Sequence, residues 1–353
     1  MLYPEYRRGL DIISIQKRID LMSKKIVLVF GATGTTGVYT VDYFRQNLDP
    51  AEFEVVPTSR RDTNYYTQRG YKYCRCDIEN AADFDNLPTE NVYAIVHLAA
   101  MLPSHMEGYH PERYIDVNIK GTLNVLEYAK RVKVDRVLFM KSIADYYGYL
   151  KEGMNFFPTD MRPKINYMTD HCVYAISKIA ACELIENYHQ MYGIKGFIFR
   201  MPNIYSYHPR HTYYVNGVKK PMGYRYVIDQ AVKGAPIEVW GDVKKGRDLV
   251  YVKDFAQILY RGLLAECDGG EFNVGSGRLT PILEHFQTIV DVFCPPDHKS
   301  ELIFCPDKRD SANYWMDISK TKSVLGYEPK YDCRAYLEDY KKEMANNRFE
   351  GLY

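Results

Sequence analysis

Short apolar runs recur along the first two hundred residues and are separated by segments with helical spacing. The run at 25–30 is apolar after its first residue and ends directly at Gly31, which is typical of a strand buried on both faces of a parallel sheet. Similar runs lie at 53–57, 71–75, 92–98, 136–140 and 195–199, and helical patterns follow Gly37 and cover 111–132 and 172–192. This alternation predicts an α/β fold, a doubly wound parallel Rossmann sheet with helices on both faces.

The pattern changes after about residue 200. Residues 203–225 are rich in Tyr, His, Asn, Pro and Gly and predict a long loop, and a strand at 237–240 and a helix at 254–265 follow. We therefore expect a smaller mixed α/β C-terminal substrate lobe, partly interleaved with the first domain. The predicted division is an N-terminal extension at 1–23, a Rossmann dinucleotide-binding domain at 24–202 and a substrate-binding lobe at 203–353.

Composition argues against several other classes of protein. The chain has 46 basic and 45 acidic residues, so it offers no broad charged surface for a nucleic-acid polymer or an anionic membrane. Its eight cysteines form no CxxC pair and no Cys/His cluster with ligand spacing, which favours reduced thiols and no metal. No run of about 18 apolar residues predicts a membrane span. We expect a cytoplasmic protein.

The extension at 1–23 carries charges that interrupt any signal-peptide apolar region. Its apolar residues at 10, 12, 13, 15 and 19 have roughly amphipathic spacing and predict a short surface helix that caps the domain. An oligomer contact and a disordered tail are the alternatives.

The segment GATGTTG at 31–37 follows the first strand and opens a helix. Glycines there allow the backbone to approach a pyrophosphate, and the helix N-terminus offers unpaired N–H groups to an anion. The segment thus predicts an NAD or NADP site, with contacts from Gly31, Thr33, Gly34, Thr35, Thr36 and Gly37. At the end of the second strand stand Arg60 and Arg61 instead of an acid for the ribose 2′-hydroxyl. Because arginine suits a 2′-phosphate, we favour NADP over NAD; the alternative is that both are solvated surface charges.

Two YxxxK sequences occur in this tyrosine-rich chain, Tyr147/Lys151 and Tyr174/Lys178. Tyr147 precedes Gly148 and is predicted to lie in a loop. Tyr174 opens the predicted helix at 172–192, where residues four apart share a face, so that a lysine can support the tyrosine from one side. We therefore assign the functional pair to Tyr174 and Lys178.

Further motifs follow one another along residues 25–330. They are Asp77-Ile78, residues 97–100, residues 118–124, residues 142–148, Tyr174–Lys178, residues 200–205, residues 247–254, residues 272–277 and residues 325–329. Together with the glycine segment, this series resembles the extended short-chain dehydrogenases/reductases, in particular the NAD(P)-dependent epimerase/dehydratase group that acts on sugar nucleotides.

The resemblance implies roles for individual residues. Further cofactor contacts would come from Arg60, Asp77, Ile78, Leu98, Ala99, Ala100, Asn118, Pro202, Tyr174 and Lys178, and substrate contacts from Met101, Asn203 and Arg247. Tyr174 would take and return the proton of a sugar hydroxyl, while Lys178 would lower the pKa of Tyr174 and hold the nicotinamide ribose. A structural alternative for Arg247 is an ion pair with Asp242 or Asp248. The resemblance also implies a homodimer through the helices at 111–132 and 172–192.

The chain departs from the family at its catalytic turn. Counting back from Tyr147, Ile143 occupies the position of the catalytic Ser or Thr, and isoleucine cannot donate a hydrogen bond. Ser142 could replace it only if the local backbone shifts, since neighbouring side chains of a strand face opposite sides; otherwise Ser142 is a structural hydroxyl. Asp145 could keep part of an acid/base role, and Ala144 replaces the acid of the 4,6-dehydratases, which ranks dehydration lower. The family has a second phosphate arginine shortly before the position of Asp317, but the aligned residue here is Asp307, and Arg309 stands two positions away, which weakens its assignment.

Three functions follow in order of preference. The first is a sugar-nucleotide epimerase with a tightly held NAD(P). The second is an NADPH-dependent reductase or dehydrogenase of a sugar nucleotide or another carbonyl compound, which Arg60 and Arg61 favour. The third is a non-catalytic dinucleotide-binding sensor, for which Ile143 is the main support.

Overall fold

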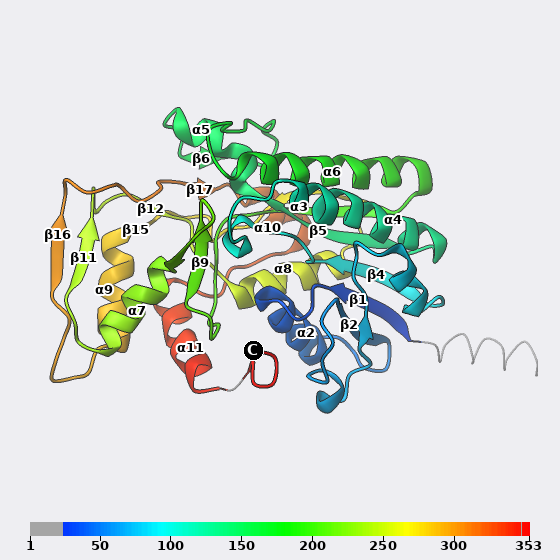
Figure 1. Ribbon diagram of the computed structural model, residues 1–353, viewed down its shortest axis with the longest axis horizontal. Coiled ribbons are helices and arrows are strands. Elements are labelled where there is room, and N and C mark those ends of the chain that lie inside the picture. Colours follow the sequence, from blue (N-terminus) through cyan, green and yellow to red (C-terminus); the bar gives the residue numbers. More distant parts are fainter. Residues whose placement is uncertain (1–23, 347) are drawn as a thin grey trace, which may run out of the picture.

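A computed structural model describes residues 24–346 and 348–353 (Figure 1). Its centre is a seven-stranded parallel sheet in the order β14-β7-β5-β4-β1-β2-β3. The strands are β1 (Lys25–Phe30), β2 (Phe53–Ser59), β3 (Cys74–Arg75), β4 (Val92–His97), β5 (Arg136–Ser142), β7 (Lys195–Met201) and β14 (Gly269–Asn273). The prediction of a Rossmann sheet is confirmed, and β14 is an additional strand that the apolar pattern did not reveal.

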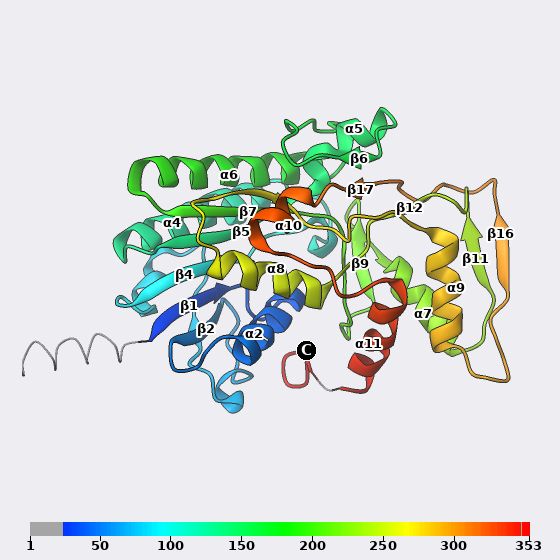
Figure 2. The same cartoon turned by 180° about the vertical axis from the view of Figure 1, so that it is seen from behind.

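Helices cover both faces of this sheet. On one face lie α2 (Thr35–Asn47) and α8 (Val252–Leu264), and on the other α4 (Gly121–Arg131) and α6 (Cys172–Tyr192), as both views show (Figure 1, Figure 2). Alternate residues of β1 serve the two faces: Val29 belongs to the core cluster with α2 and α8, and Leu28 to the cluster with α4 and α6. A strand buried on both faces therefore needs apolar residues at every position.

The second part of the chain forms a smaller mixed lobe, as predicted. Its helices are α7 (Gly223–Val232), α9 (Ile282–Phe293), α10 (Ser319–Leu325) and α11 (Cys333–Ala345). Its short strands form two-stranded pairs: β6 (Phe156–Phe157) with β17 (Trp315–Met316), β8 (Ile204–Tyr205) with β13 (Val250–Tyr251), β9 (Thr212–Val215) with β10 (Val218–Pro221), β11 (Ile237–Trp240) with β16 (Leu302–Cys305), and β12 (Gly246–Arg247) with β15 (Thr280–Pro281). Because α8 and β14 complete the Rossmann layers, the two parts share one core.

Some local predictions need correction. The prediction of a long loop at 203–225 is wrong, because this segment contains β8, the antiparallel hairpin β9–β10 and the start of α7. Tyr147 begins a short helix, α5 (Tyr147–Lys151), rather than lying in a loop. The helix predicted at 111–132 is broken into α3 (Glu112–Tyr114), a π-helical segment Ile115–Lys120 and α4.

Two further predictions meet the limits of the described residues. The amphipathic helix predicted around residues 10–19 lies outside them. Among the described helices, none combines the length and apolar character that a membrane span requires. The domain boundaries at 24–202 and 203–353 stay a prediction.

Candidate active site

The predicted site residues gather at the carboxyl edge of the sheet. The glycine segment follows β1, Met101 follows β4, Ser142 ends β5 and Asn203 follows β7. Carboxyl ends of parallel strands meet at one edge, which is where open α/β sheets bind ligands. A surface hollow of about 640 Å³ lies elsewhere, at the opposite edge, and is lined by Ile26 and Phe53 among others. The predicted chemistry is not in that hollow.

The glycine segment has the shape that a dinucleotide requires. Gly31 has a φ of +79°, and a Cβ there would lie 2.7 Å from the Ala99 nitrogen, so only glycine fits. A Cβ at Gly37 would lie 2.7 Å from the Ala32 Cα. Helix α2 begins at Thr35 after Gly34, which supplies no side-chain cap, so its first-turn N–H groups can bind an anion. The segment therefore fits the pyrophosphate of a dinucleotide.

The arginines at the end of β2 are already engaged. Arg60 is 62% exposed and its guanidinium lies 3.9 Å from Glu79, a carboxylate that Arg113 binds through two hydrogen bonds of 2.7 and 2.8 Å. Arg61 donates to the Leu352 carbonyl. The NADP preference drawn from these arginines is therefore not supported. Glu79 supplies an acid near the end of β2 that the sequence pattern did not reveal.

Ile78 and Asp77 follow β3. Ile78 is buried against Gly121, where a Cβ would lie 2.7 Å from the Ile78 Cδ1. Asp77 is half-buried and its carboxylate accepts the Glu79 N–H. Packing between β3 and α4 thus fixes the turn that the resemblance assigns to adenine.

Asn118 makes several hydrogen bonds within the chain, and its contact with the cofactor stays a prediction. Its side-chain amide accepts the Met101 N–H at 2.8 Å and donates to the Met101 carbonyl and the Ser177 hydroxyl. Ser177 in turn donates to the Tyr174 carbonyl at 2.8 Å. Asn118 is fully buried in the π-helical segment, a feature frequent at functional sites. It joins the turn after β4 to α6 and so positions Tyr174.

Tyr174 and Lys178 lie one turn apart near the start of α6, and both are buried. Burial raises the pKa of Tyr174 to about 12, and a hydrogen bond with Ser142 opposes this rise. Burial lowers the pKa of Lys178 to about 7, and its Nζ lies 3.8 Å from the centre of the Phe139 ring. Burial thus disfavours the charged form of Lys178, and within the chain itself it has more influence on the pKa of Tyr174 than the lysine has.

Ser142 and Ile143 have different surroundings in the catalytic turn. Ile143 is 3% exposed and packs in the core cluster with Val96 and Leu138, so its side chain points away from the site. The Ser142 oxygen accepts the Ala144 N–H at 3.1 Å and thereby caps a 3₁₀ turn at Ile143–Tyr146. Since that oxygen already accepts one N–H, its own proton is available to Tyr174. Ser142 is both a cap and a partner of Tyr174.

We expect Ser142→Ala to lower kcat by about 10²-fold, the usual effect of removing one such donor. Loss of the cap should also cost about 1 kcal/mol in the free energy of unfolding. Ser142→Thr keeps the hydroxyl and is the matched control, with turnover close to wild type. Steady-state kinetics and urea unfolding of the three proteins separate the two effects. Full turnover in Ser142→Ala would rule out the pairing with Tyr174.

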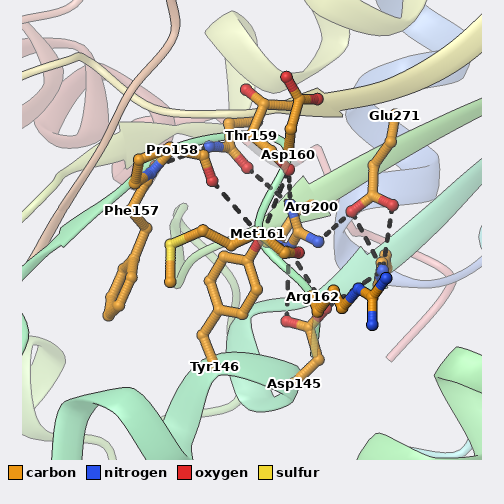
Figure 3. Close-up of polar contacts among 12 residues, drawn as sticks. Asp145, Tyr146, Phe157, Pro158, Thr159, Asp160, Met161, Arg162, Arg200 and Glu271 are labelled. Atoms are coloured by element: carbon orange, nitrogen blue, oxygen red, sulfur yellow. Dashed lines mark hydrogen bonds and ion pairs between the residues drawn. The ribbon is translucent and has the colours of Figure 1, made fainter. Parts of the chain in front are cut away.

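Asp145 is committed to a buried ion network and not to the substrate (Figure 3). Its carboxylate lies 3.2 Å from both the Lys141 Nζ and the Arg200 Nε. Arg200 has no exposed surface and also pairs with Glu271. The suggested acid/base role of Asp145 has no geometric support here, because both cations hold its oxygens inside the protein.

Arg247 offers the site a cation. It is half-buried in β12, and it makes no ion pair among residues 24–346 and 348–353. Burial acts to lower its pKa, but surrounding tyrosine hydroxyls, those of Tyr205, Tyr314, Tyr147 and Tyr213, outweigh this and raise it. The alternative pairing with Asp248 is wrong, since that carboxylate accepts N–H groups of Ser276, Gly277 and Met316. Arg247 can therefore bind an anionic ligand.

The hairpin β9–β10 lies against the loop that follows β4. The Gly108 N–H donates to the Gly217 carbonyl at 3.0 Å, and the Asn216 N–H donates to Asp170 at 2.9 Å. Asp170 also binds His171, whose ring lies 6.3 Å from that of Tyr174. The hairpin that the sequence analysis missed therefore reaches the catalytic side of α6.

The remaining predicted residues differ in exposure. Pro202 is buried and Asn203 exposed directly after β7, and Leu98 to Met101 are half-buried after β4. Asp307 and Arg309 are both exposed in a loop after β16, and a phosphate contact of Arg309 stays a prediction.

Comparison with known proteins decides the family. A family model described as "NAD dependent epimerase/dehydratase family" matches residues 27–275. The chain belongs to the NAD dependent epimerase/dehydratase family. This confirms the resemblance to extended sugar-nucleotide epimerases. The family depends on NAD, and this chain's relatives include epimerases and decarboxylases.

The relatives of this chain within the family are described as enzymes of more than one reaction. A putative UDP-glucose 4-epimerase of Methanocaldococcus jannaschii is 26% identical over 91% of this chain and 99% of its own length. A UDP-glucuronate 4-epimerase of Thermodesulfobacterium geofontis is 28% identical over 76% of this chain and 77% of its own. UDP-glucuronic acid decarboxylase 3 of Arabidopsis thaliana is 29% identical, over 89% of each chain.

Solved structures share the fold. That of the UDP-glucose 4-epimerase from Thermotoga maritima with UDP-glucose superimposes with a TM-score of 0.71 at 22% identity, covering 91% of this chain and 100% of that one. That of the UDP-glucuronic acid 4-epimerase from Bacillus cereus in complex with NAD gives 0.68 at 22% identity, covering 90% and 96%. The Rossmann sheet and the smaller lobe are thus a shared architecture.

Proposed function

We propose that the protein is an NAD-dependent epimerase of a UDP-sugar, with Tyr174 as its acid/base. The observation that carries the proposal is the arrangement of Ser142, Tyr174 and Lys178 at the carboxyl edge of the sheet, where a hydroxyl, a phenol and an amine lie together in buried surroundings. The reaction is supported by epimerases among the relatives, and UDP as the nucleotide is supported by their UDP-sugar substrates.

NAD would be held by the glycine segment and by the first turn of α2, which together fit its pyrophosphate. The turns at Asp77-Ile78 and Leu98–Ala100 would contact its adenosine and central parts, while Tyr174 and Lys178 would hold the nicotinamide ribose. When bound, NAD supplies the hydride acceptor and donor of the reaction. Its positive nicotinamide would also favour the phenolate of Tyr174, whose pKa of about 12 within the chain needs such help.

The chain's own residues would move the proton. Tyr174 would accept the proton of the sugar hydroxyl during oxidation, and it would return that proton to the ketone oxygen after the sugar has turned and presents its opposite face for reduction. Ser142 would donate a hydrogen bond to the same oxygen, since it lies beside Tyr174 and lowers the pKa of the Tyr174 phenol. Both steps need a water-poor surrounding, which the burial of Tyr174 provides.

The substrate's diphosphate would bind Arg247 and Asn203. A guanidinium matches two phosphate oxygens at once, and Arg247 has no competing carboxylate among the described residues. Met101 and the hairpin β9–β10 would line the sugar. The helices α4 and α6 would form the dimer contact, because Leu123 and Ile176 are exposed apolar side chains on them.

One experiment tests the function. Small molecules released on denaturation are identified by mass spectrometry, and the intact protein is then incubated with UDP-, GDP-, CDP- and dTDP-sugars. We expect released NAD and conversion of a UDP-sugar to an isomer of equal mass with no added cofactor.

Three results would contradict the proposal. A product of UDP-glucuronate lighter by one carbon dioxide would identify a decarboxylase. Reduction of a ketone only with added NADPH would identify a reductase. Bound cofactor without turnover on any sugar nucleotide would favour the sensor.

A further inference from the structure

Residues 348–353 run from the smaller lobe back to the dinucleotide-binding loop. Figure 1 and Figure 2 both show this segment between α11 and α2. Arg348 pairs with Asp42 of α2 and with Glu343 of α11, and its carbonyl accepts the Tyr65 hydroxyl. The segment is thus fixed to both lobes at its start.

Its later residues reach the cofactor side. Phe349 is buried, with its ring 4.9 Å from that of His208. The Tyr353 hydroxyl donates to the Thr33 carbonyl at 2.7 Å, inside the glycine segment. Thr33 in turn bonds to Ser59 at the end of β2, hydroxyl to hydroxyl at 3.0 Å. Tyr353 therefore lies where the glycine segment meets the end of β2, the region that reads the ribose of the adenosine in Rossmann folds.

The same segment holds Arg61. The Arg61 guanidinium lies 4.5 Å from the centre of the Tyr353 ring and donates to the Leu352 carbonyl. It thus has a cation–π contact and a hydrogen bond, both of which it would have to leave in order to bind a phosphate. Tyr353 is 47% exposed, so part of this residue is accessible from solvent.

A negative charge near the end of β2 also disfavours a 2′-phosphate. Glu79 lies 3.9 Å from Arg60, and Arg113 holds the Glu79 carboxylate in position. A carboxylate near the 2′ position repels a 2′-phosphate and can accept a hydrogen bond from a 2′-hydroxyl. Both features act against NADP.

We propose that Tyr353 sets the preference for NAD over NADP by holding Arg61 away from the 2′ position of the adenosine ribose. The inference rests on the proposed NAD-dependent function and deepens it. The chain has an arginine at the place typical of NADP-binding sites, and a residue nearly three hundred positions later in the sequence keeps that arginine from a 2′-phosphate.

Binding of NAD and NADP to the full chain, stripped of cofactor, is measured by isothermal titration calorimetry. Wild type should bind NAD more tightly. In Tyr353→Ala the ratio of the NADP to the NAD dissociation constant should fall by about tenfold, the size of one charge-assisted contact to a phosphate. Tyr353→Phe keeps the ring over Arg61 and should change the ratio by less than about threefold, because only contacts of a neutral hydroxyl are lost.

The double variant Tyr353→Ala/Arg61→Ala identifies the cause. If the released Arg61 binds the 2′-phosphate, the double variant should return to the wild-type ratio. An unchanged ratio in Tyr353→Ala, or a fall that persists in the double variant, would overturn this inference while leaving NAD-dependent epimerisation intact. A wild type that prefers NADP would also overturn it, and one that binds neither dinucleotide would overturn both proposals. Circular dichroism of each variant checks that the fold is kept.

Discussion

Tyr174→Phe should lower kcat by about 10³-fold, because the variant lacks the group that exchanges the proton of the sugar hydroxyl. The ring stays in place, so the buried contacts of Tyr174 with its neighbours on α6 and with Tyr114 remain. NAD binding should weaken by less than about tenfold, since one hydroxyl contact to the nicotinamide ribose is lost while Lys178, the glycine segment and the N-terminus of α2 are kept. The measurement is steady-state turnover of the UDP-sugar found in the substrate panel, together with calorimetry of NAD.

Tyr114→Phe is the matched control. Tyr114 is also buried, and its ring lies 5.8 Å from that of Tyr174, but no part of the proposed reaction uses its hydroxyl. Turnover in that variant should stay within about threefold of wild type, in keeping with the modest net effect of one neutral hydroxyl. Full activity in Tyr174→Phe, or an equal loss in both variants, would mean that the acid/base is another group.

The sheet and the functional pair could be predicted because each depends on neighbouring residues in the sequence. A strand buried on both faces must be apolar throughout, as at 25–30, and residues four apart on a helix must share a face, as Tyr174 and Lys178 do. Strand β14 carries Gly269 and Gly270 and only one large apolar residue, Phe272, so its place in the sheet is set by pairing with β7 and is not visible locally.

The catalytic turn could be predicted only in part, for a related reason. Counting positions assumed that the strand continued through Ile143, but β5 ends at Ser142 and a 3₁₀ turn begins. The turn directs Ile143 into the core and leaves the hydroxyl of Ser142 toward Tyr174. No apolar pattern distinguishes such a turn from one more strand residue.

Contacts between residues far apart in the sequence could not be predicted from local patterns. Arg61 looked free for a 2′-phosphate because its partners, Leu352 and Tyr353, lie at the far end of the sequence. Asp145 looked like a candidate acid because its cations come from β5 and β7. In both cases the sequence reveals the charge but not what neutralises it.

Arg200→Met should destabilise the protein by about 3–5 kcal/mol, the usual effect of removing one partner from a buried ion pair. Arg200 has no exposed surface and forms ion pairs with Asp145 and Glu271 (Figure 3). It also donates hydrogen bonds to the Thr159 carbonyl and to the Asn273 side chain. Methionine fills part of the volume but leaves Asp145 with Lys141 as its single cation. Urea unfolding followed by circular dichroism measures the loss, and Arg334→Met, which removes a 55% exposed guanidinium, should cost less than about 1 kcal/mol.

The loss should also depend on pH in a defined direction. Burial already raises the pKa of Asp145, with Arg200 and Lys141 opposing the rise, so removal of Arg200 must raise it further. A folded-state pKa above the unfolded value of about 3.9 means that the folded protein binds the extra proton, and stability then falls as pH rises through that range. The difference between wild type and Arg200→Met should therefore be smaller at pH values near 5 than near 8. A difference that stays constant or grows toward low pH would show that lost packing, and not the unpaired carboxylate of Asp145, causes the destabilisation.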